Sequence, residues 1–139
     1  NKMQNLEKII VNTLRKANYT NNKRVDQFLV NLALYSPLGI LPGESQEKYA
    51  EKANIPKTKI TNYSAGLGVA TGLIKLALAD KVDDYSLTEF LGMPTRSLAI
   101  YTLTDSMIRL NYANITGKPM GTLLIEGYRR TKDIINKKE

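Results

Sequence analysis

Three residue types are missing from this chain of 139 residues, which has no cysteine, no histidine and no tryptophan. Without cysteine there is no disulfide, no thiolate metal ligand and no thiol nucleophile. Without histidine the chain lacks the commonest general base and the commonest metal ligand. Only carboxylates, lysines and hydroxyl groups remain for chemistry. We therefore expect a protein that is not an enzyme and that needs no cofactor and no metal.

Long apolar runs are also scarce. The longest, residues 65–79, is interrupted by Lys75 and is too short to span a bilayer. Residues 1–10 carry charges at Lys2, Glu7 and Lys8 and lack the apolar core of a signal peptide. These absences predict a cytoplasmic protein with no membrane partner.

The residues that are present follow helical spacing. At 42% hydrophobic and 24% charged, the chain can form one domain with its own core. Apolar residues recur three and four apart, which is typical of one helix face, in two sets: Leu6, Ile9, Ile10 and Leu14, then Val25, Phe28, Leu29 and Leu32. Further helices are expected at 45–53, 57–79, 95–112 and 121–137. No segment alternates as a strand, so we expect an all-α fold, a compact bundle of six or seven helices.

Three parts are expected within this single domain. Residues 1–42 form a basic pair of helices and end in a loop rich in proline and glycine. Residues 44–80 form a helix-turn-helix unit. Residues 85–139 form a second helical unit with a basic tail, in which Ser86 and Glu89 have the spacing of a capping box.

The net charge of +7 is concentrated at the two ends. Residues 1–24 hold six cations against one carboxylate, a balance of +5, and residues 106–139 hold seven against three, a balance of +4. Two basic ends around a nearly neutral middle indicate an anionic partner. The alternative is a lysine-rich surface that only keeps the protein soluble.

An internal repeat links two segments 38 residues apart. Residues 54–63 and 92–101 each place a proline third, an apolar residue four positions later and a tyrosine three positions after that. Proline suits the first turn of a helix, where its missing amide hydrogen would have no partner. The repeat therefore predicts two similar helix starts.

Residues 46–66 resemble the helix-turn-helix of Cro/lambda-repressor-type DNA-binding domains. Ala50 is the small residue at which the second helix crosses the first, and Asn54 occupies the turn position that usually holds glycine. Ile55, Ile60 and Tyr63 fall where the family packs its second helix down. The resemblance implies a recognition helix that lies in the major groove.

The same resemblance implies a set of nucleic-acid contacts at the start of the second helix. Lysine reaches guanine acceptors or phosphates, asparagine pairs with adenine, and the methyl group of threonine contacts thymine. A glutamine at the start of the preceding helix would contact a phosphate. The expected contacts are Gln46, Lys57, Thr58, Lys59, Thr61 and Asn62.

The second copy is degenerate, because Arg96 is the one charged residue on its expected reading face. We expect this copy to be structural, with Arg96 as a further nucleic-acid contact. Arg129, Arg130 and Lys132 in the basic tail are expected to bind phosphates. The glycines at 66, 68 and 72 are expected to let another helix approach closely, since no βαβ unit surrounds them to form a dinucleotide loop.

Three functions compete. The first is a non-enzymatic, dimeric helix-turn-helix DNA-binding regulator. The second is a small basic helical subunit of a larger nucleoprotein assembly, similar in character to CRISPR effector small subunits and archaeal viral coat proteins, which binds backbone phosphates without base specificity. The third is a structural helical protein. The expected partners are nucleic acid, with DNA favoured and RNA possible, together with further copies of the chain or the other subunits of a complex.

Overall fold

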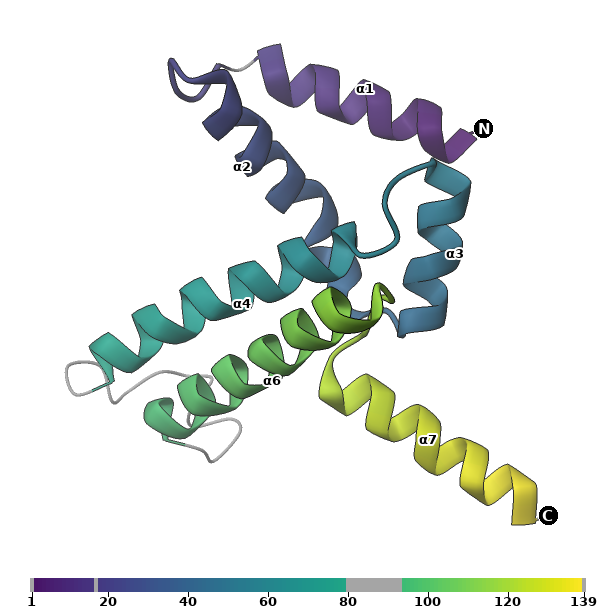
Figure 1. Ribbon diagram of the computed structural model, residues 1–139. Helices are drawn as coiled ribbons and strands as arrows, with labels where there is room; N and C mark the ends of the chain where they lie inside the picture. The colour runs from purple at the N-terminus through teal and green to yellow at the C-terminus, as the bar shows by residue number, and fades with distance from the viewer. Residues whose placement is uncertain (1, 17, 80–93, 139) are drawn as a thin grey trace.

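The computed structural model describes residues 2–16, 18–79 and 94–138, and these are entirely helical apart from turns and loops (Figure 1). The elements are α1 (Lys2–Lys16), α2 (Lys23–Tyr35), the short 3-10 helix η1 (Pro37–Ile40), α3 (Gly43–Ala53), α4 (Lys59–Leu78), α6 (Thr95–Thr116) and α7 (Leu123–Lys138). The predicted all-α fold is confirmed. The expected capping box at Ser86 and the first part of the second repeat, residues 87–93, lie outside the described residues.

Helices α4 and α6 form the centre of the molecule and run antiparallel, side by side (Figure 1). Glycines permit this close approach. A Cβ atom on Gly68 would lie 2.0 Å from Ser106 Oγ, and one on Gly72 would lie 2.8 Å from Leu103 Cγ. The predicted close approach of a second helix is therefore confirmed at these two glycines but not at Gly66, where a Cβ atom would meet nothing within 4 Å.

A buried arginine connects four parts of the chain. The Arg109 side chain on α6 donates hydrogen bonds to Gly39 O at 3.2 Å, Ser64 Oγ at 2.6 Å and Met120 O at 3.2 Å. Asp105, one turn earlier, lies 3.8 Å from the guanidinium and accepts a hydrogen bond from Leu123 N. Because these partners satisfy the buried charge, Arg109 joins η1, α4 and the start of α7 to α6.

The N-terminal helices turn different faces inward from those the apolar spacing predicted. On α2 the buried residues are Asp26, Val30, Asn31 and Tyr35, whereas Phe28 is 52% exposed. Hydrogen bonds explain this choice, because Asn31 donates to Tyr63 Oη and Tyr35 donates to Glu7. Most of the apolar face of α2 is thus exposed, although Phe28 contacts the Tyr63 ring and Leu32 is half-buried.

The predicted inward face of α1 is wrong in the same way. Leu6 and Ile9 are 58% and 62% exposed, and Ile10 is also exposed, whereas Leu14 is half-buried. The helix turns Glu7 toward Tyr35 of α2, together with Val11. The hydrogen bond to Tyr35 thus sets the rotation of α1.

Helix α7 leaves the body and projects outward (Figure 1). Its first turns are attached by Glu126, while residues 130–137 are all exposed. None of the described helices is long and apolar enough to cross a membrane.

Candidate nucleic-acid interface

The corner between α3 and α4 has the backbone that the helix-turn-helix resemblance implies. Asn54 ends α3 in the left-handed conformation, with φ 56° and ψ 49°, and Ile55 N donates to Ala50 O at 3.0 Å. Asparagine tolerates this conformation better than most residues with a side chain. Ala50 and Ile60 are fully buried at the crossing. The turn at Asn54 thus joins α3 and α4 by a tight corner with a buried small residue, Ala50, on α3.

Two of the predicted contacts lie inside the core. Gln46 and Thr61 are each 0% exposed. Thr61 Oγ1 donates to Gln46 Oε1 at 2.6 Å, and Gln46 Nε2 donates to Leu41 O at 2.8 Å. Met120 N donates in turn to Thr61 Oγ1 at 3.0 Å. The prediction that Gln46 and Thr61 contact nucleic acid is thus wrong, because both side chains hold the loop before α7 against α4.

The two lysines of the predicted reading face have partners within the protein. Lys57 lies in the turn before α4, and its Nζ is 3.1 Å from Glu47 Oε1. Lys59 is half-buried, with its Nζ 4.7 Å from the centre of the Tyr35 ring. A cation over an aromatic face is held by the negative face of the ring. To contact a base, Lys57 would have to leave Glu47, and Lys59 would have to leave the Tyr35 ring.

Thr58 and Asn62 complete that face, and both are half-buried. Asn62 Nδ2 donates to Thr58 Oγ1 at 3.4 Å, while Asn62 Oδ1 is buried without a hydrogen-bond partner. Among the predicted contacts at this corner, only Lys57 is exposed, and they form no cluster of exposed base-reading groups.

The remaining predicted residues lie on other helices. Arg96 is exposed in the first turn of α6. Arg129, Arg130 and Lys132 lie on α7, far from the corner along the projecting helix (Figure 1). The structure thus does not bring the ten predicted contacts together on one surface.

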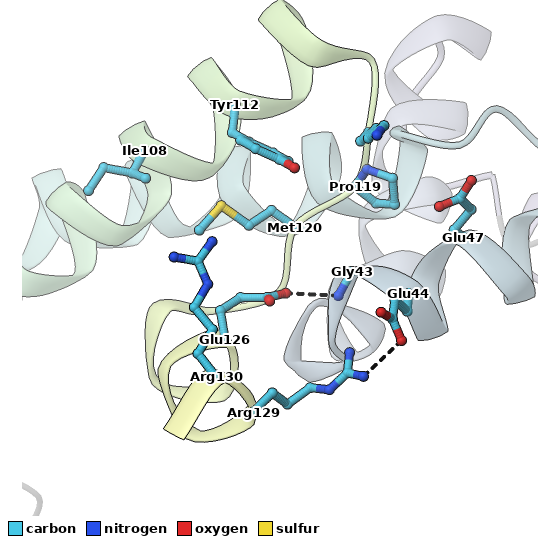
Figure 2. Close-up of a pocket in the computed structure, with 11 residues that line it drawn as sticks. Gly43, Glu44, Glu47, Ile108, Tyr112, Pro119, Met120, Glu126, Arg129 and Arg130 are labelled. Atoms are coloured by element: carbon cyan, nitrogen blue, oxygen red, sulfur yellow. Dashed lines mark hydrogen bonds and ion pairs between the residues drawn. The ribbon is translucent and has the colours of Figure 1, made fainter. Parts of the chain in front are cut away.

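Arg129 and Arg130 line a cleft of about 400 Å³ between the start of α3, the end of α6 and α7 (Figure 2). Glu126 Oε1 accepts hydrogen bonds from Gly43 N and Gly121 N, both at 2.9 Å. These bonds join the start of α3 to α7 and to the loop before α7. Arg129 Nη2 lies 2.8 Å from Glu44 Oε2, and this hydrogen bond lowers the pKa of the Glu44 carboxyl.

The charges around this cleft are balanced. Its cations are Lys118, Arg129 and Arg130, and its carboxylates are Glu44, Glu47 and Glu126. Three carboxylates would repel a phosphate at close range. The cleft is therefore a poor site for a polyanion, although Arg130 is exposed at its edge.

A stronger cationic cluster lies at the turn between α1 and α2, and we call it the elbow. It consists of four exposed side chains: Arg15, Lys16, Lys23 and Arg24. Within the described residues none of the four has a recorded ion pair. Two of them line a recess of about 370 Å³.

Local hydrogen bonds shape the elbow and occupy its carboxylate. Asn18 turns the chain in the left-handed conformation, with φ 47°, and the Asn22 side chain accepts from Arg24 N at 3.0 Å to cap α2. Asp26 Oδ1 accepts from Thr20 N at 2.8 Å and Thr20 Oγ1 at 2.7 Å. Asp26 is buried and lines the recess with Arg15 and Lys23, so it offsets part of their charge, while all four cations are exposed.

The individual elbow residues were not among the predicted contacts, although the sequence carried the signal. Four cations fall between residues 15 and 24 with no carboxylate among them. What the sequence could not show is that a turn brings the two ends of this run together.

Comparisons with known proteins identified no family for this chain. No protein-family model, no curated protein and no solved structure matches this chain.

Proposed function

We propose that this protein is a non-enzymatic subunit that binds the phosphate backbone of nucleic acid and assembles in several copies along it. The observation that supports this proposal most is the elbow, where four exposed cations outnumber the one buried carboxylate, Asp26, that lines the recess with Arg15 and Lys23. A second set of exposed cations, Arg130, Lys132 and Lys137, lies on α7.

The arrangement of the two cationic regions favours assembly over the reading of a single site. The elbow and the end of α7 lie at opposite ends of the molecule (Figure 1). A polyanion that contacts the elbow of one copy can therefore contact α7 of another copy. Between these two regions, Arg109 and Lys59 have partners inside the protein.

Salt dependence of binding tests the proposal. Four phosphate contacts at the elbow predict that log K falls with log salt at a slope of about −3.6 on duplex DNA and about −2.8 on single strands. Titrations against duplex DNA, single-stranded DNA and RNA of mixed sequence would measure these slopes. Arg15→Gln with Lys23→Gln should reduce the magnitude of the duplex slope by about 1.8.

A charge-matched control is available on α3 and α4. Lys48→Gln with Lys75→Gln removes the same charge from exposed positions outside the elbow. This control should leave the slope nearly unchanged. Equal losses in the two double variants, or no binding by the unaltered chain at low salt, would overturn the proposal.

A DNA-binding regulator is the second candidate, and the left-handed turn at Asn54 and the burial of Ala50 favour it. It requires Lys59 to leave the Tyr35 ring and meet a base. Binding that survives excess competitor DNA and is lost selectively in Lys59→Ala or Asn62→Ala would establish the regulator instead.

A further inference from the structure

The outer face of α7 carries a mostly apolar stripe that the described part of the chain leaves exposed. Its members, spaced four, three and four residues apart, are Leu124, Tyr128, Thr131 and Ile135. Leu124 is 71% exposed, Tyr128 67% and Ile135 54%. This is the spacing at which one helix packs along another over several turns. With 16 residues, α7 is about 24 Å long, and the stripe extends along about 16 Å of it.

A glycine beside the stripe has no packing neighbour among the described residues. Gly127 lies inside α7, its φ is not positive, and a Cβ atom there would meet nothing within 4 Å. A glycine in a helix interior costs about 1 kcal/mol relative to alanine. By contrast, Gly68 and Gly72 are needed for contact with α6. Gly127 therefore fits a helix that approaches from outside the chain.

The charges of α7 lie away from the stripe. In the heptad of the stripe, the flanking positions hold Ile125, Gly127, Lys132 and Ile134, of which only Lys132 is charged. Arg130 and Lys137 lie farther round the helix. A polyanion would find one cation on this face, whereas an apolar helix would find a continuous surface.

We propose that α7 of one copy packs antiparallel against α7 of a second copy. This register places Leu124 opposite the second copy's Ile135, and Tyr128 opposite its Thr131. Gly127 then faces the second copy's Ile134, so a missing side chain meets a large one. Lys132 faces Ile125, and no like-charged pair meets across the contact.

The antiparallel direction also suits the rest of the molecule. Each body is attached at the first turn of its own α7, so the two bodies lie at opposite ends of the helix pair (Figure 1). Opposed helix dipoles favour the same direction. Arg130 and Lys137 of both copies then lie on one side of the pair. This last point rests on the proposed function, because that side would bind the nucleic acid backbone.

Sedimentation equilibrium without nucleic acid, over a wide concentration series, tests the pairing. The unaltered chain should pass from monomer to dimer as its concentration rises. Tyr128→Ser with Ile135→Ser should stay monomeric, and at concentrations where both chains are monomeric its melting temperature should match that of the unaltered chain, since both side chains are exposed. Arg130→Gln with Lys137→Gln should still form dimers. An unaltered chain that stays monomeric throughout, or a serine variant that associates as well as the unaltered chain, would overturn the proposal.

The absence of cysteine allows a direct test of direction. A mixture of Leu124→Cys and Ile135→Cys chains should form the mixed disulfide under mild oxidation. Leu124→Cys alone should not, because eleven residues of helix separate the two thiols by about 16 Å. Efficient bridging of Leu124→Cys with itself would overturn the antiparallel arrangement.

These results separate the pairing from the function on which part of it rests. If the serine variant associates normally while nucleic acid binding keeps its salt slope, the pairing fails and the proposed function stands. If dimers form and bind no nucleic acid, the pairing stands and the proposed function fails.

Discussion

The centre of the molecule and its two ends use the same residue types in opposite ways. At the centre, Arg109 makes hydrogen bonds to three parts of the chain and is 3% exposed. At the elbow, Arg15 and Arg24 face solvent with no recorded ion pair in the described structure. Position in the fold, rather than residue type, therefore decides whether a cation stabilises this protein or is available to a partner.

The largest expected effect distinguishes these two kinds of arginine. Arg109→Met leaves Asp105 and three hydrogen-bonding groups without their partner in the core, so we expect a loss of about 3–5 kcal/mol in the free energy of unfolding. Arg130→Met, at an exposed position, should change it by less than about 0.5 kcal/mol. Urea unfolding followed by circular dichroism measures both. Equal effects would show that the central network contributes little.

The junction between centre and end should give the next largest effect. Glu126→Ala removes the carboxylate that accepts from Gly43 N and Gly121 N, and we expect a loss of about 2 kcal/mol. Hydrogen exchange should also become faster in α7 and in the first turn of α3. Asp133→Ala, on the exposed part of the same helix, is the matched control and should change neither measurement.

Much of the fold could be predicted from the sequence. Helical spacing and turn residues located the helices to within a few residues, and Asn54 was recognised as the turn between α3 and α4. The inward faces of α1 and α2 could not be predicted from apolar spacing. Their rotation depends on hydrogen bonds from Tyr35 to Glu7 and from Asn31 to Tyr63, which join residues 28 and 32 positions apart.

The candidate site was less predictable, for a similar reason. Gln46 and Thr61 are polar residues at positions that would contact DNA in a helix-turn-helix protein. Here the backbone of Met120, far away in sequence, forms hydrogen bonds with both side chains, which are buried in the core. Local patterns could not show this contact. The charge pattern was informative about exposure, because the four cations of the run at residues 15–24 are all exposed.

Two glycines in α4 allow a covered position to be compared with an open one, with smaller expected effects. Gly72→Ala should destabilise the protein by about 1 kcal/mol, because the new methyl group would lie 2.8 Å from Leu103 Cγ. Gly66→Ala should stabilise it by about 0.5–1 kcal/mol, because space is open there and alanine favours the helix. Thermal unfolding of the two variants checks the opposite signs. Destabilisation of similar size in both would mean that a neighbour also covers Gly66.

The last effect concerns how α1 is held to α2, and it depends on pH. Burial and the hydrogen bond to Glu7 raise the pKa of Tyr35 above its ordinary value of 10.0. The neutral phenol therefore contributes stability that is fully present below about pH 10 and is lost as the pH rises further. Tyr35→Phe should be less stable than the unaltered chain by about 1 kcal/mol at neutral pH. Thermal unfolding should show this gap narrowing above pH 10, whereas Tyr128→Phe, at an exposed position, should follow the unaltered chain throughout. A gap that stays constant across the alkaline range would mean that the Tyr35 hydroxyl does not hold α1 in place.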